Sequence, residues 1–546
     1  MVRSTVRVAG WPLRRAAAAV QRLATGSNAV VDVVVEPVEE LLARSRWLEQ
    51  LEGLARDPGV AAVVLHLHGA PGGWATLQGL VEVVGRLRAA DKRVYAFLEA
   101  PGNAAMLVAA AVDRSFVVPT TEVGLVGLGI ELTFFGALLE HLGLRPDFEA
   151  AGAYKSFGEP WTRSFASPAN LEAMGELVAD LQGQLVAQIA THRNLSEDAV
   201  AQLVARAPLA AAEAVAEGLV DQLAYEDQLQ EWLEEAHGSD LRRVRFEAWA
   251  VRDAASAWLE QRGAPDEHVA VLHLEGAIAL DRRRTGVGAR QVVPVLQQLR
   301  EDDEVAAVVL HVSSPGGSAL ASDLMWREVE RLGRAKPVVA CFADVAASGG
   351  FYLAAPAKEI VVREGTLTGS IGVFGGKLVA GEGMRKLGVH SQPINAAPNA
   401  NLFSPSRPFT DGQRERFRAS LQRMYDGFVS RVAEGRGEPE EVVEPHCRGR
   451  VWTGSAAKER GLVDRFGGLD VAVERATALA GTQQLRVVHH SPHPTFDPAG
   501  WVRKQLGEAL PGAARLALHE LASVSEFLVE HQGQALAMLP FTVRVR

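Results

Sequence analysis

The chain has 546 residues, more than one hydrophobic core usually organises, so at least two domains are expected. Apolar residues make up 48% and charged residues 22%, as in ordinary soluble globular proteins. The net charge of −10 argues against nucleic-acid binding, because neutralising phosphates requires a basic surface. Two cysteines, Cys341 and Cys447, cannot form a disulfide framework, and no Cys/His cluster has zinc-site spacing. No metal or cofactor is therefore expected.

Residues 1–28 form a basic segment with five arginines among short apolar runs. No stretch in it reaches the roughly 18 uninterrupted apolar residues of a membrane-spanning helix. The segment fits an amphipathic helix lying on an anionic membrane surface. The alternative, which we favour slightly, is a frayed terminus or an arm packed on the protein.

The chain that follows is an internal duplication. Residues 60–73 read VAAVVLHLHGAPGG, and residues 305–317 read VAAVVLHVSSPGG, an offset of about 244 with one gap. The same offset, within a residue or so, relates residues 93–97 to 337–341 and residues 217–221 to 460–464. Several blocks in one order indicate two related domains. We place the first repeat at 29–226 and the second at 267–480.

Each repeat alternates short apolar strands with helical stretches. The strands Val60–Leu67 and Val305–Val312 end in Pro-Gly-Gly turns, and helices are predicted over Ala75–Ala90 and Ala319–Ala335. The next strands are Val94–Leu98 and Val338–Phe342. This alternation is typical of βαβ units, so an α/β fold with largely parallel sheets is expected.

Two segments flank the second repeat. Residues 227–266 are rich in charge and are expected to link the repeats. Residues 481–546 are expected to form a helical tail, because leucines recur at helical spacing after Pro498. This tail would pack on its own domain or on a neighbouring subunit.

Ser348 lies in the segment ADVAASGGFY, directly after the strand Val338–Phe342. A turn of small residues before a helix predicts that Ser348 lies at a helix N-terminus, where free amides favour an anion. The amide of Gly349 would then face a developing oxyanion, and Gly350 would allow a peptide backbone to approach. A plain N-cap is the commoner role of serine at such a position.

Two other loops of small residues adjoin predicted strands. In Ser314–Ser318, an amide of Gly316 or Gly317 is a candidate second oxyanion donor, although the segment also fits an ordinary turn. In the loop TLTGSIGV, the hydroxyl of Ser370 is a candidate for orienting a base.

A catalytic serine needs a base, and no histidine has a recognisable triad context; His66, His68 and His311 lie in or at the ends of apolar strands. Lysine can serve when burial leaves it neutral, whereas arginine stays protonated. Only eight of the 56 Lys and Arg residues are lysines, and Lys155 lies in the loop AAGAYKSFGEP. Taken alone, Lys155 also fits an ordinary surface lysine.

Together these segments resemble the long, duplicated form of signal peptide peptidase A, also called protease IV. The resemblance covers about residues 30–480 and is carried by three motifs: Tyr154-Lys155-Ser156 with Glu159-Pro160, Ala347-Ser348-Gly349-Gly350-Phe351, and Thr368-Gly369-Ser370-Ile371-Gly372.

The resemblance implies two tandem crotonase/Clp-like domains. It implies Ser348 as nucleophile, Lys155 as general base and Ser370 as the hydroxyl that holds the lysine, with oxyanion contacts from Gly349 and Gly317. A homotetramer that cleaves signal peptides or other short apolar peptides, and that associates with a membrane, is the corresponding expectation.

The repeat supports a composite site. Ser348 aligns with Ala104, Lys155 with Ala400 and Ser370 with Leu125. The first half has the lysine without the serine, and the second half has the reverse. One site built from both halves is therefore predicted.

Two other functions stay open. A crotonase-type enzyme acting on acyl-CoA would need neither Ser348 nor Lys155, and a non-catalytic scaffold would bind peptides without cleaving them. Because no clear membrane-spanning segment is present, a soluble, cytoplasmic location stays open beside membrane association.

Overall fold

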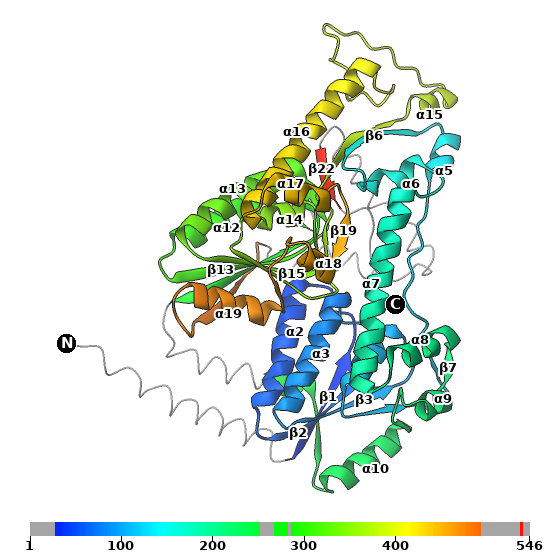
Figure 1. Cartoon of the computed structure of the whole chain (residues 1–546), viewed down its shortest axis with the longest axis vertical. Helices are drawn as coiled ribbons and strands as arrows, with labels where there is room; N and C mark the ends of the chain where they lie inside the picture. The colour runs from blue at the N-terminus through cyan, green and yellow to red at the C-terminus, as the bar shows by residue number, and fades with distance from the viewer. Residues whose placement is uncertain (1–27, 252–266, 282–285, 493–534, 539–546) are drawn as a thin grey trace, which may run out of the picture.

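Each half of the chain contains a parallel sheet (Figure 1). The computed structural model describes residues 28–251, 267–281, 286–492 and 535–538. The first sheet has the order β8-β4-β3-β2-β1-β9, and all its pairings are parallel. Its strands are β1 (Ala29–Val35), β2 (Val60–Leu67), β3 (Arg93–Leu98), β4 (Arg114–Val117), β8 (Gln222–Leu223) and β9 (Arg242–Arg245).

The second sheet has the order β19-β17-β15-β13-β10-β21, with β16 pairing with β15 and β20. Its pairings are parallel except that between β17 and β19. The strands are β10 (His268–Glu275), β13 (Val305–Ser314), β15 (Val338–Ala347), β16 (Glu359–Val362), β17 (Leu367–Gly369), β19 (Val451–Thr453), β20 (Arg465–Phe466) and β21 (Arg486–His490).

Helices cover these sheets, whose central strands are apolar on both faces, as is usual for parallel sheets. In the first half they are α2 (Leu41–Gly53), α3 (Trp74–Ala89), α4 (Asn103–Ala111), α5 (Gly136–His141), α6 (Glu159–Thr162), α7 (Pro168–Arg193), α8 (Glu197–Arg206), α9 (Ala211–Ala216) and α10 (Glu226–His237). In the second half they are α12 (Ala289–Glu301), α13 (Ala319–Ala335), α14 (Gly349–Ala354), α15 (Gly381–Lys386), α16 (Asp411–Arg436), α17 (Glu440–Val443), α18 (Gly454–Glu459) and α19 (Leu469–Leu479).

A third sheet joins the two halves. Its order is β12-β11-β14-β22-β18-β6, with strands β12 (Val287–Gly288), β11 (Ile278–Ala279), β14 (Gly316–Ser318), β22 (Ala535–Met538), β18 (Val373–Val379) and β6 (Arg145–Ala151). Strand β6 comes from the first half and pairs antiparallel with β18 of the second half over seven residues. The smaller strands β5 (Glu122–Val123) and β7 (Leu209–Ala210) form a separate pair.

The predicted α/β class and parallel sheets are confirmed, and the predicted strands and helices lie within a few residues of the observed ones. The linker prediction is wrong for residues 227–251. There α10 covers the first sheet and β9 extends it, and the Trp249 side chain is buried with its indole N–H donating to Asp57. Residues 252–266 lie outside the described residues.

The tail prediction is wrong for residues 486–490 and 535–538, which are strands: β21 extends the edge of the second sheet, and β22 lies between β14 and β18 in the third. The remaining tail residues, 493–534 and 539–546, lie outside the described residues, as do residues 1–27 of the basic segment. Within the described ranges, no helix combines the length and apolarity that crossing a membrane requires.

The two halves also make contact through the carboxylate of Asp344. The Asp344 carboxylate at β15 accepts hydrogen bonds from the amides of Gly73 (3.0 Å) and Thr76 (2.7 Å) and from the Thr76 hydroxyl (2.7 Å). The second half thus caps the N-terminus of α3 in the first half, where a carboxylate is favourable.

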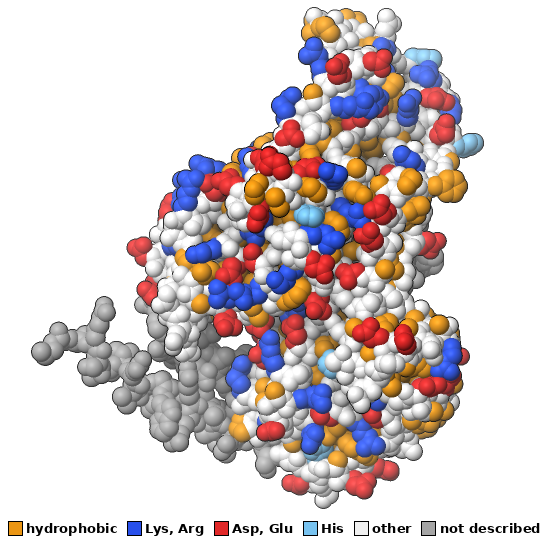
Figure 2. Space-filling view, viewed as in Figure 1, with side chains coloured by type: hydrophobic (Ala, Val, Ile, Leu, Met, Phe, Trp, Pro, Cys, Tyr) orange, Lys and Arg blue, Asp and Glu red, His pale blue; other side chains and the backbone are white. Residues whose placement is uncertain are grey.

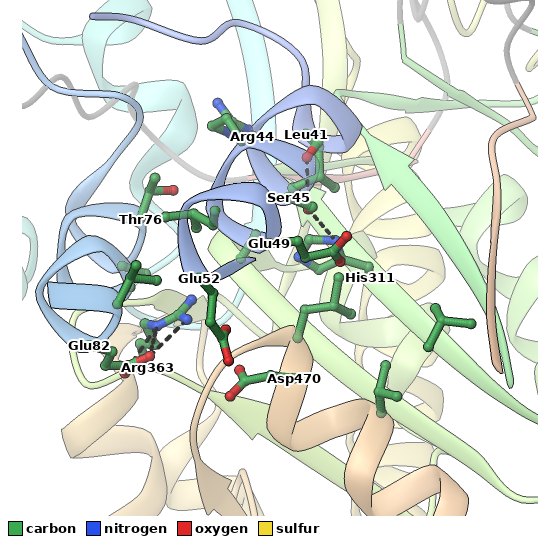
Figure 3. Close-up of a pocket in the computed structure, with 18 of the residues that line it drawn as sticks. Leu41, Arg44, Ser45, Glu49, Glu52, Thr76, Glu82, His311, Arg363 and Asp470 are labelled. Carbon is green, nitrogen blue, oxygen red and sulfur yellow. Dashed lines mark hydrogen bonds and ion pairs between the residues drawn. The ribbon is translucent and has the colours of Figure 1, made fainter. Parts of the chain in front are cut away.

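A cavity of about 350 Å³ lies between α2, α3 and the second half (Figure 3). At its edges the Arg363 guanidinium pairs with Glu82 at 2.9 Å, and the Ser45 hydroxyl lies 3.4 Å from His311 Nδ1. Its lining includes neither Lys155 nor Ser348, so this cavity is separate from the candidate site.

Elsewhere the surface mixes acidic and basic side chains, with apolar side chains exposed around α5 and α15 (Figure 2). These include Leu138, Leu142 and Leu387.

Candidate active site

The sheet shared by the two halves brings Lys155 to Ser348. Ala151, the last residue of β6, lies opposite Val373, the first residue of β18. Lys155 follows β6 by four residues, and Ser370 precedes β18 by three. In an antiparallel pair the end of one strand lies beside the beginning of the other, so the loop after β6, which carries Lys155, meets the loop before β18, which carries Ser370.

The Lys155 amine has three close partners. Its Nζ lies 2.7 Å from Ser348 Oγ, 2.8 Å from the Ser370 carbonyl oxygen and 2.9 Å from Ser370 Oγ. A neutral amine has two N–H donors and one lone pair. The two donors match the oxygens of Ser370, and the lone pair is then available to the Ser348 hydroxyl proton.

The environment favours the neutral form of this amine. Lys155, Ser348 and Ser370 are all buried, and burial lowers the pKa of Lys155 well below its ordinary value. Desolvation disfavours a charged ammonium, and the shift has no contribution from a carboxylate. The amine is thus suited to accept a proton.

Ser348 has an unusual backbone. It is the N-cap residue of α14 with φ 53° and ψ −114°, a conformation that L-residues rarely adopt, and its hydroxyl makes no capping hydrogen bond. The plain N-cap interpretation is therefore wrong. The Ser348 amide donates to the Gly369 carbonyl at 2.8 Å, which helps to fix this strained turn.

Gly449 is a site residue that the sequence analysis missed. Its φ is +80°, and a Cβ at this position would lie 2.6 Å from the backbone nitrogen of Lys155 and 2.7 Å from the Lys155 Cβ. The neighbouring Arg448 carbonyl accepts a hydrogen bond from the Tyr154 amide at 2.8 Å. This loop of the second half therefore supports the lysine loop directly. No sequence motif marks it, because the requirement arises only from the docking of the halves.

The predicted oxyanion glycines lie around the same turn. Gly349 begins α14, and Gly317 lies in β14, where a Cβ would come within 2.0 Å of the Ile278 carbonyl oxygen. The Gly316 amide donates to Ser314 Oγ at 3.2 Å. The oxyanion roles of Gly349 and Gly317 stay predictions.

The structure shifts one of the aligned positions in the repeat. In the first half Gly102 forms a bridge to Gly124, and in the second half Ala347 pairs with Gly369. These two pairs correspond at an offset of 245, so the counterpart of Ser348 in the first half is Asn103. The alignment of Ser348 with Ala104 is thus wrong by one residue. The Asn103 amide group bonds both backbone groups of Gly127, so a side chain without nucleophilic chemistry occupies this place in the first half.

Lys155 also lines a cavity of about 1020 Å³ beside β6 and α16. Phe148, Trp161 and Phe374 contribute to its wall, and Arg414 and Arg418 lie on the side of α16. A molecule of the size of a short peptide has room to reach the lysine from this side.

Comparison with known proteins identifies the family of this chain. The model of peptidase family S49 matches residues 86–240 and again residues 330–483, together more than half of the chain. The chain belongs to peptidase family S49, and the double match agrees with the duplication.

Named relatives cover most of the chain. It is 29% identical to "Serine protease SPPA, chloroplastic" of Arabidopsis thaliana over 77% of this chain, but only 63% of that protein is covered. It is 28% identical to "Protease 4" of Salmonella typhi over 83% of this chain and 76% of that protein. A solved structure of a membrane-bound stomatin-specific protease aligns with 42% of this chain and 99% of its own chain at 14% identity, with a TM-score of 0.27.

Proposed function

We propose that this protein is a serine endopeptidase in which Ser348 is the nucleophile and Lys155 the general base. The observation that carries the proposal is the distance of 2.7 Å between Lys155 Nζ and Ser348 Oγ in a buried site that favours a neutral amine. The names of the relatives support the same reaction class.

The proposed reaction starts with transfer of the Ser348 hydroxyl proton to neutral Lys155 while Oγ attacks a peptide carbonyl carbon. Backbone amides, of which those of Gly349 and Gly317 are the candidates, stabilise the tetrahedral oxyanion. The Lys155 ammonium then gives its proton to the departing amine, and an acyl-enzyme remains on Ser348. A water molecule, deprotonated by Lys155, hydrolyses this ester and restores the serine.

The substrate is proposed to be an extended peptide. Strand β22 of the chain itself lies between β14 and β18, antiparallel to both, with Met538 opposite Gly316. A peptide that replaces β22 would gain the same main-chain hydrogen bonds beside the proposed oxyanion glycines. Cleaved signal peptides and other short apolar peptides fit this mode. The crotonase/Clp-like class of the two domains is part of the same proposal.

The test combines active-site labelling with kinetics. A fluorophosphonate probe is expected to label Ser348 in the intact protein, and Ser348→Ala and Lys155→Ala are each expected to lower kcat/KM on an unfolded apolar peptide by about 10³-fold or more. Lys458→Ala, which removes an exposed lysine, is the matched control. Full activity in Lys155→Ala would refute the base, and an acyl-CoA enzyme would leave Ser348 unlabelled.

A further inference from the structure

Residues 447–452 of the second half lie against both loops of the candidate site, and we call this segment the support loop. The Ser370 amide donates a hydrogen bond to the Arg450 carbonyl oxygen at 2.6 Å. Gly449, the residue before it, packs directly on the Lys155 backbone. The support loop therefore touches both the proposed base and the residue whose two oxygens hold its amine.

Ser370 depends on this contact because its backbone has an uncommon conformation. Its φ is 51°, in the left-handed region that residues other than glycine rarely adopt. Such a conformation persists only where the surroundings fix it. Both Ser370 oxygens lie within 2.9 Å of the Lys155 amine, so a movement of the Ser370 backbone would displace that amine.

The Arg450 side chain joins the support loop to the first half through α7, which runs beside β19 (Figure 1). Its guanidinium donates to Glu172 at 2.8 Å and to Glu176, both on α7. The guanidinium carbon lies 4.6 Å from the centre of the Tyr154 ring, and the Tyr154 hydroxyl donates to Glu172 at 3.1 Å. One side chain thus connects the support loop, α7 and the residue that precedes Lys155.

The chemistry of arginine suits this place. A guanidinium is planar and has donors on separate nitrogens, so it can pair with two carboxylates while it stacks on aromatic rings. The Trp452 ring lies 4.7 Å from the guanidinium carbon as well, and the Arg450 side chain is only 12% exposed. A lysine ammonium could not make all these contacts at once.

The duplication supplies counterparts for these residues. Strands β7 and β19 correspond at an offset of 243, as do helices α7 and α16, which both have 26 residues and a hydroxyl N-cap. At the offsets of their segments, three members of the cluster have counterparts without charge or aromatic ring: Arg450 has Ala207, Tyr154 has Asn399 and Glu176 has Ala419. Glu172 aligns with Glu415. The base is absent from the repeat too, at Ala400, so the cluster accompanies the lysine.

We propose that Arg450 is a positioning residue of the peptidase site, which holds the support loop on α7 and so keeps the Lys155 amine against Ser370 and closed to water. The inference rests on the proposed function, because it assigns Arg450 a part in the Ser348–Lys155 reaction. Without Arg450 the support loop can move away from Lys155. The amine then loses its fixed position, which slows proton transfer, and water reaches it, which stabilises the ammonium form.

Steady-state kinetics over a range of pH tests this role. In Arg450→Met, kcat is expected to fall by about 10²-fold, the effect of a misplacement of about 1 Å, with KM nearly unchanged. The pH at which kcat is half-maximal is expected to rise by at least about one pH unit, because water moves the pKa of Lys155 back toward its ordinary value. The charged side chains of β6, α6 and α16 that line the same cavity, such as Glu149, Glu159 and Arg414, are not causes of the lowered pKa.

Arg363→Met is the matched control. Arg363 also belongs to the second half, is 14% exposed and pairs with Glu82 of the first half at 2.9 Å. It lines the cavity that is separate from the candidate site. This variant is expected to lose comparable stability in chemical denaturation and to keep the kcat and the pH profile of the native chain.

Two smaller substitutions keep the test decisive if Arg450→Met folds poorly. Arg450→Lys keeps the charge but loses the forked pairing, and Glu176→Gln removes one of the two carboxylates. Each is expected to lower kcat by about tenfold, half of the full effect on a free-energy scale, and to raise the half-maximal pH. In the Arg450→Met background, Glu176→Gln is expected to have no further effect on kcat, because both act through one contact.

Three results would overturn the inference: native kcat and pH profile in the Arg450 and Glu176 variants, an equal change in Arg363→Met, or a lower kcat with an unchanged half-maximal pH. The last result would make Arg450 a structural residue only. Activity retained in Ser348→Ala and Lys155→Ala would instead refute the proposed function. If those two variants are inactive while Arg450→Met behaves as the native chain, the proposed function stands and only this inference fails.

Discussion

To act as the proposed general base, Lys155 must be able to lose a proton, and its burial favours this. Lys155→Arg keeps a long cationic side chain but cannot supply a neutral base, because guanidinium stays protonated in proteins. We expect kcat/KM to fall by about 10²–10⁴-fold, as for removal of a general base. Activity near that of the native chain in Lys155→Arg would contradict a deprotonated base.

The lowered pKa of Lys155 also sets a pH dependence. Activity is expected to rise with pH as the folded-state pKa of Lys155 is passed and the amine becomes neutral. Between that pKa and the ordinary value of 10.5, the unfolded chain binds a proton that the folded chain does not. The contribution of Lys155 to the free energy of unfolding therefore rises with pH in this window. Lys155→Met, which cannot titrate, is expected to reduce this slope in denaturant titrations at several pH values.

Gly449 provides a test of how the lysine loop is held. Gly449→Ala is expected to displace the Lys155 backbone and to lower kcat by about 10²-fold, the effect of a misplacement of about 1 Å. Gly437→Ala is the matched control, because Gly437 has a similar positive φ of 68° but nothing within 4 Å of an added Cβ. Equal kcat values for the two variants would show that contact with Lys155 is unimportant.

Individual site residues could be predicted from the sequence where the proposed reaction requires particular residue types. Ser348, Lys155 and Ser370 were singled out because nucleophile, base and supporting hydroxyl are few residue types, and the structure brings all three within hydrogen-bond distance. Gly449 and Asn103 could not be found in this way. Their places depend on how two distant loops pack and on a one-residue register in the sheet.

At the scale of elements, α3 depends on the other half of the chain for its N-cap. Asp344→Ala removes that cap and leaves the amides of Gly73 and Thr76 without their carboxylate. We expect the free energy of unfolding to fall by about 1–2 kcal/mol and kcat to fall as well, since Asp344 lies four residues before Ser348. Chemical denaturation and steady-state kinetics measure the two effects.

The matched control for this prediction is Ser196→Ala. Ser196 caps α8 by accepting from the Ala199 amide, within the first half alone. This variant is expected to lose comparable stability and to keep its kcat. If Asp344→Ala also kept its kcat, the cap would be structural only.

Elements with strong periodicity were predictable, and those defined by distant partners were not. The strands β2 and β13 follow from apolar runs rich in valine, and α13 follows from its apolar spacing. Strands β9 and β22 have little local signal, because each forms by pairing with strands that are distant in the sequence. For this reason the charge-rich residues 227–251 were wrongly predicted to be a linker. Leucine spacing likewise predicted a helical tail where residues 486–490 and 535–538 are strands.

For the whole molecule, the site is complete within one chain. Lys155 and Ser348 of the same chain lie in hydrogen-bond contact. A mixture of the Ser348→Ala and Lys155→Ala proteins, unfolded and refolded together, is therefore expected to stay inactive in a peptidase assay. Recovery of substantial activity would show that the base is exchanged between copies.

The proposed base and the proposed nucleophile are separated by 193 residues, which has a consequence for synthesis of the protein. A ribosome that has released only the first half has exposed a lysine with no serine beside it, and the amine is not yet desolvated by the second half. Lys155 and Ser348 come together, and the Lys155 amine becomes buried, only when the second half has folded onto the first. A nascent or truncated chain that lacks the second half therefore also lacks the proposed site, so peptidase activity is expected to appear only after the second half has folded.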